Sequence, residues 1–224
     1  DEDSDFTSED LQRAPPNFAY YDENIVFVDI EQITVNLTLD VEHQTATAEA
    51  NIAFMQPKCG LPVIDLIPEP TAVAIGDATL DANSLQIISD PDEQSEFRVL
   101  AHRLPAGHHN IQLRYEITDD DVIRFDENTL EFFSYMDDWE TRPYAEQFFP
   151  ANFIFDQYAM TVRVSITNTQ SPHQLFTNGT VSNTAANYFA IQFPDHSHSA
   201  WPYIHIVNQE NLQQLNGHFE GIAG

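Results

Sequence analysis

The feature that most constrains the fold is a strict alternation of apolar and polar residues near the start of the chain. Five apolar residues stand at every second position, separated by polar ones: Ile33, Val35, Leu37, Leu39 and Val41. Successive side chains of a β-strand point to opposite faces, so this period of two predicts a strand with one buried face. A turn at His43-Gln44 and a second alternating run from Ala46 to Phe54 predict a hairpin.

Similar short segments, bounded by turn residues, recur along the rest of the chain. Gly76-Asp77 predicts a tight turn between two strands, and Leu104 to Gly107 introduces an alternating strand from Ile111 to Ile117. We expect further strands at residues 63–67, 71–75, 85–88, 97–100, 129–136, 158–166, 175–176, 188–193 and 203–207. A long amphipathic helix is absent from the sequence pattern. Many short strands favour a sandwich or a barrel, and we expect an all-β, antiparallel β-sandwich with little helix.

Length and composition suit a single folded domain with short extensions. The chain has 224 residues, of which 42% are hydrophobic, as in one large all-β domain. Residues 1–23 start with an acidic polar run and contain Ala14-Pro15-Pro16, so we expect a flexible leader. The β-sandwich domain is expected to span residues 24–208. Residues 209–224 are expected to be a C-terminal tail or linker, with a short helix from Gln209 to Leu215.

The formal net charge of −28 limits the partners of this protein. Such a surface repels nucleic acid and anionic membranes, and no apolar run is long enough for a membrane span. The acidity fits either salty surroundings, where ions screen repulsion, or a general need for solubility. The acidic opening resembles a segment that follows a removed signal or lipid anchor, which implies a periplasmic or extracellular location.

Short catalytic motifs are missing from the sequence. It contains no HExxH zinc motif, no GxSxG nucleophile elbow, no GxxxxGK[ST] phosphate loop and no GxGxxG. Cys59 is the only cysteine, which excludes an intrachain disulfide, and we interpret it as a small apolar filler. The sequence therefore predicts no catalytic residue in this chain.

Three polar clusters raise the question of a metal site. Asp195-His196-Ser197-His198 offers three ligand types, but Pro194 and the serines indicate an exposed loop. Asp119-Asp120-Asp121, and the loop with Asp90, Asp92 and Glu93, lack the spacing of a calcium-binding loop. We interpret them as solvated charge and predict no metal site.

A segment rich in aromatic residues stands out in the second half of the chain: Phe132, Phe133, Tyr135, Trp139, Tyr144, Phe148, Phe149, Phe153, Phe155 and Tyr158. Aromatic side chains on a sandwich can stack against sugar rings, fill the core, or form an interface with another domain. Core and interface together are favoured over a ligand platform.

Several elements of the chain resemble one family in their order. Phe149-Pro150, Asp156 and the strand from Met160 to Ile166 are similar to a segment of the N-terminal domain of M1-family zinc aminopeptidases. Thr177-Asn178-Gly179 stands where that family has Ser-Asn-Gly. Residues 188–193 and 201–207 resemble its following hairpin, and the strands at 33–41 and 45–54 resemble its opening pair. The family's cysteine is Ala151 here, and its Asp-Glu-Pro is replaced by Phe153-Ile154-Phe155, as in a divergent branch.

The resemblance implies a role in a larger enzyme. In the family, this domain packs on a catalytic domain and contributes a Gln or Glu that binds the free amine of a peptide substrate. Glu140 stands at the matching distance before Pro150, and Glu146 and Gln147 are nearby alternatives. A carboxylate there suits an ammonium group, because charge-assisted hydrogen bonds are strong. Zinc is expected only in the catalytic domain, which this sequence does not contain. The alternative is a free-standing secreted binding module for carbohydrate or protein.

Overall fold

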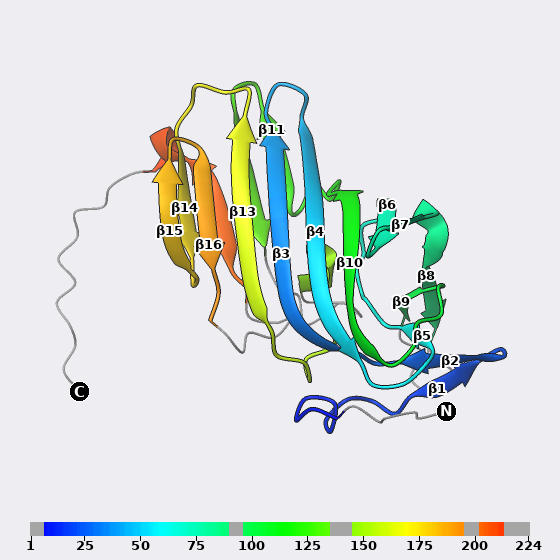
Figure 1. Cartoon of the computed structure of the whole chain (residues 1–224). Helices are drawn as coiled ribbons and strands as arrows, with labels where there is room; N and C mark the ends of the chain where they lie inside the picture. The colour runs from blue at the N-terminus through cyan, green and yellow to red at the C-terminus, as the bar shows by residue number, and fades with distance from the viewer. Residues whose placement is uncertain (1–6, 90–95, 135–144, 195–201, 213–224) are drawn as a thin grey trace, which may run out of the picture.

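A mixed eight-stranded β-sheet forms the larger layer of the molecule (Figure 1). The computed structural model describes residues 7–89, 96–134, 145–194 and 202–212. The spatial order of the strands is β15 (Thr180–Ala185), β16 (Tyr188–Gln192), β13 (Ala159–Thr167), β3 (Asp29–Asp40), β4 (Thr45–Gln56), β10 (Gly107–Glu116), β6 (Pro70–Ile75) and β7 (Ala78–Leu80). Six of the seven pairs are antiparallel, and β13 pairs with β3 in parallel.

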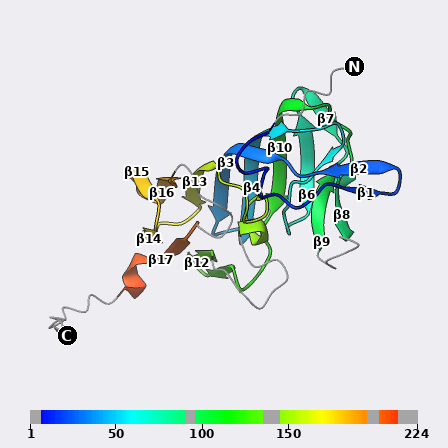
Figure 2. The ribbon, with the colours of Figure 1, turned by 90° about the horizontal axis from the view of Figure 1, so that it is seen from below.

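A four-stranded sheet forms the second layer. It comprises β11 (Ile123–Asp126), β12 (Thr129–Ser134), β17 (Ile204–Asn208) and β14 (His173–Thr177), all antiparallel. Seen from below, β14, β17 and β12 lie across from β16, β13 and β3 of the larger sheet (Figure 2). The expected all-β sandwich is therefore confirmed, with the parallel pair as a local departure.

The core lies between these two sheets and follows from the alternating sequence. Val35 and Leu39 on β3 are fully buried, while Thr34, Asn36 and Thr38 on the other face remain partly exposed. From the small sheet, Phe132 and Ile206 enter the same cluster. Because apolar burial is the main driving force for folding, this period-two pattern fixes the face that each strand turns inward.

A smaller apolar cluster occupies one end of the molecule. It lies where a three-stranded sheet, β1 (Phe18–Tyr20), β2 (Glu23–Val26) and β5 (Leu61–Pro62), approaches the hairpin β8 (Leu85–Ser89) and β9 (Glu96–Leu100). Leu11, Ala14 and Phe18 pack against it. Residues 7–23 thus differ from the expected flexible leader, since their apolar side chains and β1 are held by the sandwich. Residues 1–6 lie outside the described residues.

Two other expectations differ from the structure. The described strands within the expected hairpin at 188–193 and 201–207 do not pair with each other: β16 pairs with β13 and β15, whereas β17 pairs with β12 and β14. The apolar run Val63 to Ile67 is not a strand. It is held instead by single bridges from Val63 to Val99 and from Asp65 to Ala151. In both cases the pairing is set by residues that are distant in the sequence.

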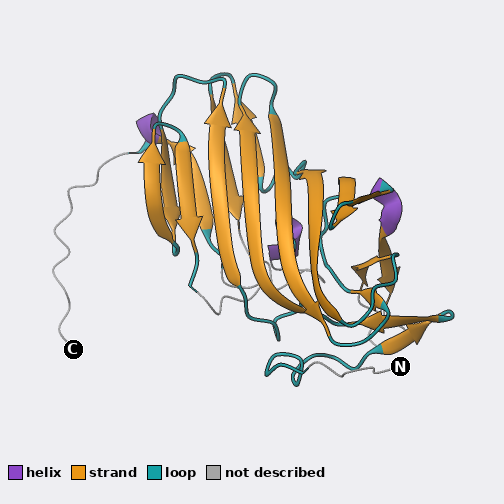
Figure 3. Ribbon diagram, in the orientation of Figure 1, coloured by secondary structure: helices purple, strands orange, loops and turns teal. Residues whose placement is uncertain are grey.

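Helical structure is limited to three short 3₁₀ turns in the described chain (Figure 3). They are η1 (Ala82–Ser84), η2 (Ala145–Gln147) and η3 (Gln209–Asn211). The expected helix from Gln209 to Leu215 is therefore present only as η3, and residues 213–215 lie outside the described part. No helix among the described residues has the length and apolar character of a membrane span.

Candidate functional site

The segment that the resemblance links to substrate binding runs into the sandwich core at η2. Of the three predicted residues, Glu140 lies outside the described residues. Glu146 is only 6% exposed, and its carbonyl accepts a hydrogen bond from the backbone N–H of Ile67 at 2.6 Å. Gln147, next in the turn, is partly exposed. η2 therefore places Glu146 inward and leaves Gln147 nearer the surface.

The residues after η2 anchor this segment. Phe148 and Phe149 are buried and stack edge to face, with ring centroids 5.0 Å apart. The hydroxyl of Tyr115 on β10 donates to the carbonyl of Phe148 at 3.0 Å. Packing in the main core and this hydrogen bond therefore anchor the segment that follows η2.

A buried carboxyl group ties the next loop to the start of β3. Asp156 has no exposed surface, and its Oδ2 accepts a hydrogen bond from the N–H of Ile30 at 2.9 Å. Asn152 donates from Nδ2 to the carbonyl of Val28 at 2.7 Å and to Asp156 at 3.2 Å. Burial raises the pKa of Asp156 to about 8, and the neighbouring Asp29 contributes in the same direction.

Two more aspartates stand beside Asp156. Asp29, at the start of β3, and Asp10, from the N-terminal segment, place one carboxylate oxygen each within 4.8 Å of the other and of Asp156. Burial raises the pKa of Asp29, while a hydrogen bond from Ser8 opposes that shift. The sequence analysis missed this group, because Asp10 fell in the expected leader. A signal did exist at Asp29, a charged residue that directly follows the apolar run Ile25 to Val28.

The outer face of the four-stranded sheet carries a row of rings. Phe133 on β12, His205 on β17 and Phe176 on β14 are direct cross-strand neighbours. Ring centroids of Phe133 and His205 are 4.9 Å apart, and those of His205 and Phe176 are 6.2 Å apart. Tyr203 stacks edge to face on Phe133 at 5.8 Å. We call Phe133, Phe176, Tyr203 and His205 the aromatic row.

The aromatic row is accessible on the described surface. Phe176 is 44% exposed and Tyr203 is 38% exposed. A shallow groove of about 670 Å³ runs along them and is bordered by Val181 and His205 as well. Exposed aromatic groups that gather on one face are typical of interaction surfaces rather than of free solvent-facing sheets.

The predicted aromatic segment divides among several environments. Phe132, Phe148, Phe149 and Tyr158 belong to the main core, Phe155 and Phe153 contribute to the smaller cluster, and Phe133 joins the aromatic row. Tyr135, Trp139 and Tyr144 lie outside the described residues. In the described part, core positions dominate, and one residue reaches an outer face.

Of the metal candidates in the sequence, only Asp119 to Asp121 lies within the described residues. Asp119 accepts a hydrogen bond at Oδ1 from the N–H of Asp121, which closes a solvated turn, and Asp121 lies 3.7 Å from Arg124. The loops with His196 and His198, and with Asp90 to Glu93, lie outside the described residues. Cys59 is partly buried and accepts a hydrogen bond from Arg103 Nε at 3.2 Å.

Comparison with solved structures identifies enzymes with this fold. Yeast LTA4 hydrolase in complex with bestatin matches with a TM-score of 0.60 and 12% identity, over 91% of this chain and 33% of the enzyme. The M1 zinc metallopeptidase from Deinococcus radiodurans matches with a TM-score of 0.53 and 14% identity, over 80% of this chain and 42% of the enzyme. A mutant of that peptidase bound to a Tyr-Ser-Ala substrate gives a TM-score of 0.54, 14% identity and the same coverage.

These matches define the fold of the chain and the share of the matched enzymes that it spans. No family model matches the sequence, and no curated protein matches it. The chain spans less than half of the enzymes it matches. The fold resemblance inferred from Phe149-Pro150 and the strand order is thus confirmed at the level of structure.

Proposed function

We propose that this chain is the non-catalytic N-terminal β-sandwich domain of an M1-like zinc metallopeptidase. The observation that carries the proposal is the fold match over 80 to 91% of the chain to enzymes of which it covers only 33 to 42%. The sequence has no HExxH motif, so the zinc and the hydrolytic chemistry would belong to a separate catalytic domain of the same polypeptide.

The aromatic row supports a specific place for that catalytic domain. It lies on the outer face of the four-stranded sheet, and β17, one of the two central strands of that sheet, is the last strand of the described chain. We propose that the catalytic domain packs against this outer face. Aromatic anchors at the centre of an interface supply most of its binding energy, and Phe176 and Tyr203 are exposed enough to act as such anchors.

A contribution to substrate binding is the second part of the proposal. The Deinococcus peptidase was solved with a bound Tyr-Ser-Ala substrate, and a peptide N-terminus carries an ammonium group that a carboxylate or amide oxygen can bind. Glu140 and Gln147 are the preferred candidates here. Glu146 is a weaker one, because its buried position separates it from solvent.

The reading frame of the gene beyond Gly224 tests the domain assignment. We expect an HExxH motif followed by a glutamate about 18 residues later. A reading frame that closes after Gly224 would contradict the assignment and would favour the free-standing binding module. The 224-residue chain itself should not hydrolyse aminoacyl-p-nitroanilides in the presence of zinc, and turnover there would also contradict it.

Steady-state kinetics of the complete protein test the substrate-binding role. Glu140→Ala or Gln147→Ala should raise KM for peptides with a free N-terminus about tenfold or more. Glu42→Ala, an exposed residue in the turn between β3 and β4, is the control and should leave KM unchanged. Equal KM values for the wild type and both segment variants would remove residues 140 and 147 from the site.

A further inference from the structure

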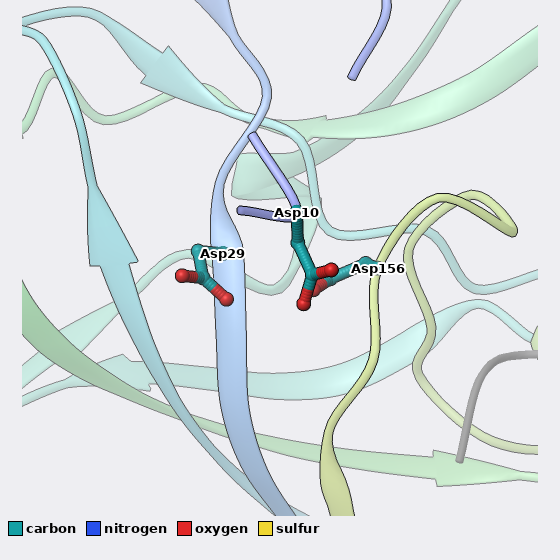
Figure 4. A group of neighbouring side chains, drawn as sticks. All are labelled: Asp10, Asp29 and Asp156. Atoms are coloured by element: carbon teal, nitrogen blue, oxygen red, sulfur yellow. The ribbon is translucent and has the colours of Figure 1, made fainter. Parts of the chain in front are cut away.

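We propose that Asp10, Asp29 and Asp156 form a calcium-binding site that fastens the N-terminal segment to the sandwich. The three residues come from distant parts of the chain: the N-terminal segment, the start of β3 and the loop before β13 (Figure 4). Each offers one carboxylate oxygen, and these oxygens all lie within 4.8 Å of one another. Three carboxylates so close together repel each other unless a cation or a proton lies among them.

The second observation is an unpaired oxygen on Asp156. This residue has no exposed surface, and its Oδ2 is occupied by the N–H of Ile30 and the amide of Asn152. Its Oδ1 has no hydrogen-bond partner in the part of the chain that the structure describes. Figure 4 shows the carboxylate of Asp156 directed toward that of Asp10. A buried carboxylate oxygen without a partner is costly, so a ligand at this position would satisfy it.

The charges around the group favour a further cation. Arg13 approaches Asp10 to 3.8 Å, but its side chain is largely exposed and it offsets only one of three negative charges. Ser8 hydrogen-bonds to Asp29 and supplies a neutral hydroxyl. His108 lies near enough to influence Asp29 electrostatically, and its ring pairs with Glu31 at 3.1 Å.

The ligand set points to calcium rather than magnesium. Both are hard cations that prefer carboxylate oxygens, and both fit oxygens that lie within 4.8 Å of one another. Magnesium demands near-ideal octahedral geometry and usually keeps several waters beside one or two carboxylates. Three protein carboxylates from separate parts of the chain are instead typical of the flexible, all-oxygen coordination of calcium.

Binding there would act on the N-terminal segment most directly. Asp10 is the only ligand from that segment, and its Oδ2 already accepts a hydrogen bond from the N–H of Gln157 at 3.3 Å. A calcium ion would join Asp10 to β3 and to the loop that carries Asn152 and Asp156. That loop follows η2, so the site would also stiffen the chain on the far side of the proposed substrate-binding segment.

Calorimetric titration of the 224-residue chain with calcium chloride tests the proposal, after removal of metals with EDTA. We expect one site per chain with a dissociation constant of about 10⁻⁴ to 10⁻³ M or tighter, and at least about tenfold weaker binding of magnesium. Calcium should also raise the midpoint of thermal unfolding and slow proteolysis at Arg13, the arginine of the N-terminal segment.

Asp29→Asn and Asp156→Asn are the informative variants, and Asp121→Asn is the matched control in the densest acidic run. The amide that replaces the carboxylate of Asp156 keeps an oxygen for the N–H of Ile30, so this variant should fold, which its thermal unfolding in EDTA would verify. We expect both site variants to bind calcium at least about tenfold more weakly and the control to bind like the wild type. Absence of calcium binding by the wild type, or equal binding by all four proteins, would overturn the proposal and leave a shared proton as the stabilising feature.

Discussion

The outer face of the eight-stranded sheet carries threonine, asparagine and charged side chains, whereas the outer face of the four-stranded sheet carries the aromatic row. On the larger sheet, Arg114 and Glu49 are cross-strand neighbours and form an ion pair at 2.7 Å. On the smaller sheet, the equivalent cross-strand neighbours are Phe133 and His205, then His205 and Phe176. The outer face of the larger sheet is hydrophilic, whereas the outer face of the smaller sheet retains apolar surface that a partner would cover.

Strand alternation alone therefore does not determine which residue types stand on the outer surface of each sheet. Both sheets alternate between a core face and an outer face, so both satisfy the same folding requirement. Only the choice of outer residues differs, and folding of the isolated sandwich does not require aromatic groups there. We therefore attribute the aromatic row to contact with the proposed catalytic domain.

The largest expected effect separates the two faces of one strand. Phe132 is fully buried and Phe133, its neighbour on β12, lies on the outer face. Phe132→Ala should lower the free energy of unfolding by about 3–5 kcal/mol, because it leaves a cavity between the sheets. Phe133→Ala should cost about 1 kcal/mol or less, since part of the ring is solvated already. Urea unfolding of both variants measures this, and similar losses would contradict the assignment of the two faces.

A smaller effect concerns a histidine that joins the two sheets. His173 on β14 has Nδ1 3.1 Å from Asn187 Oδ1, in the turn between β15 and β16, and its Nε2 accepts a hydrogen bond from the N–H of Leu130 at 3.3 Å. Burial lowers the pKa of His173 below its usual value near 6.5. The folded state thus binds fewer protons than the unfolded state, so this contribution to stability is complete above about pH 6.5 and lost as pH falls through the folded pKa.

Unfolding by urea at about pH 7.5 and about pH 5.5 measures that contribution. The wild type should lose stability at the lower pH, and His173→Gln should lose less between the two values, since glutamine does not titrate. His102→Gln is the control in the exposed turn between β9 and β10 and should keep the wild-type pH dependence. If His173→Gln also keeps it, the neutral histidine is not the link between the sheets.

The smallest effect is expected on the polar face. Arg114→Ala removes the ion pair with Glu49, and both side chains are exposed. Exposed pairs contribute under about 1 kcal/mol and are screened by salt. Thermal unfolding should therefore change little, and less still at high salt. A large loss would show that the outer face of the eight-stranded sheet is stabilising in its own right.

The sequence predicted the strands whose alternating pattern can be recognised from neighbouring residues. It missed short strands that are ordered only by pairing with another strand. The runs at 33–41 and 46–54 became β3 and β4, because alternation of side chains is readable from neighbours alone. The short strands β1 and β11 were not expected, since their few residues are ordered by pairing with β2 and β12.

The candidate sites were harder to predict from the sequence than the fold. The folded chain alone brings together Asp10, Asp29 and Asp156, because β3 and the loop before β13 must first be in place. Their spacing in the sequence therefore does not predict the group. Glu146 and Gln147 are adjacent residues, yet the 3₁₀ turn buries one and leaves the other partly exposed. For the aromatic row, the cross-strand register brings together residues 133, 176 and 205, which no linear motif connects.

Hydroxyl-radical footprinting of the complete protein and of the 224-residue chain tests the central claim most directly. Phe176 and Tyr203 are the reporters, while Tyr21, 88% exposed, and Ile87, 49% exposed, are internal controls away from the aromatic row. If a catalytic domain covers the row, oxidation of Phe176 and Tyr203 should fall several-fold in the complete protein, while Tyr21 and Ile87 react as before. Equal oxidation of Phe176 and Tyr203 in both proteins would contradict the account.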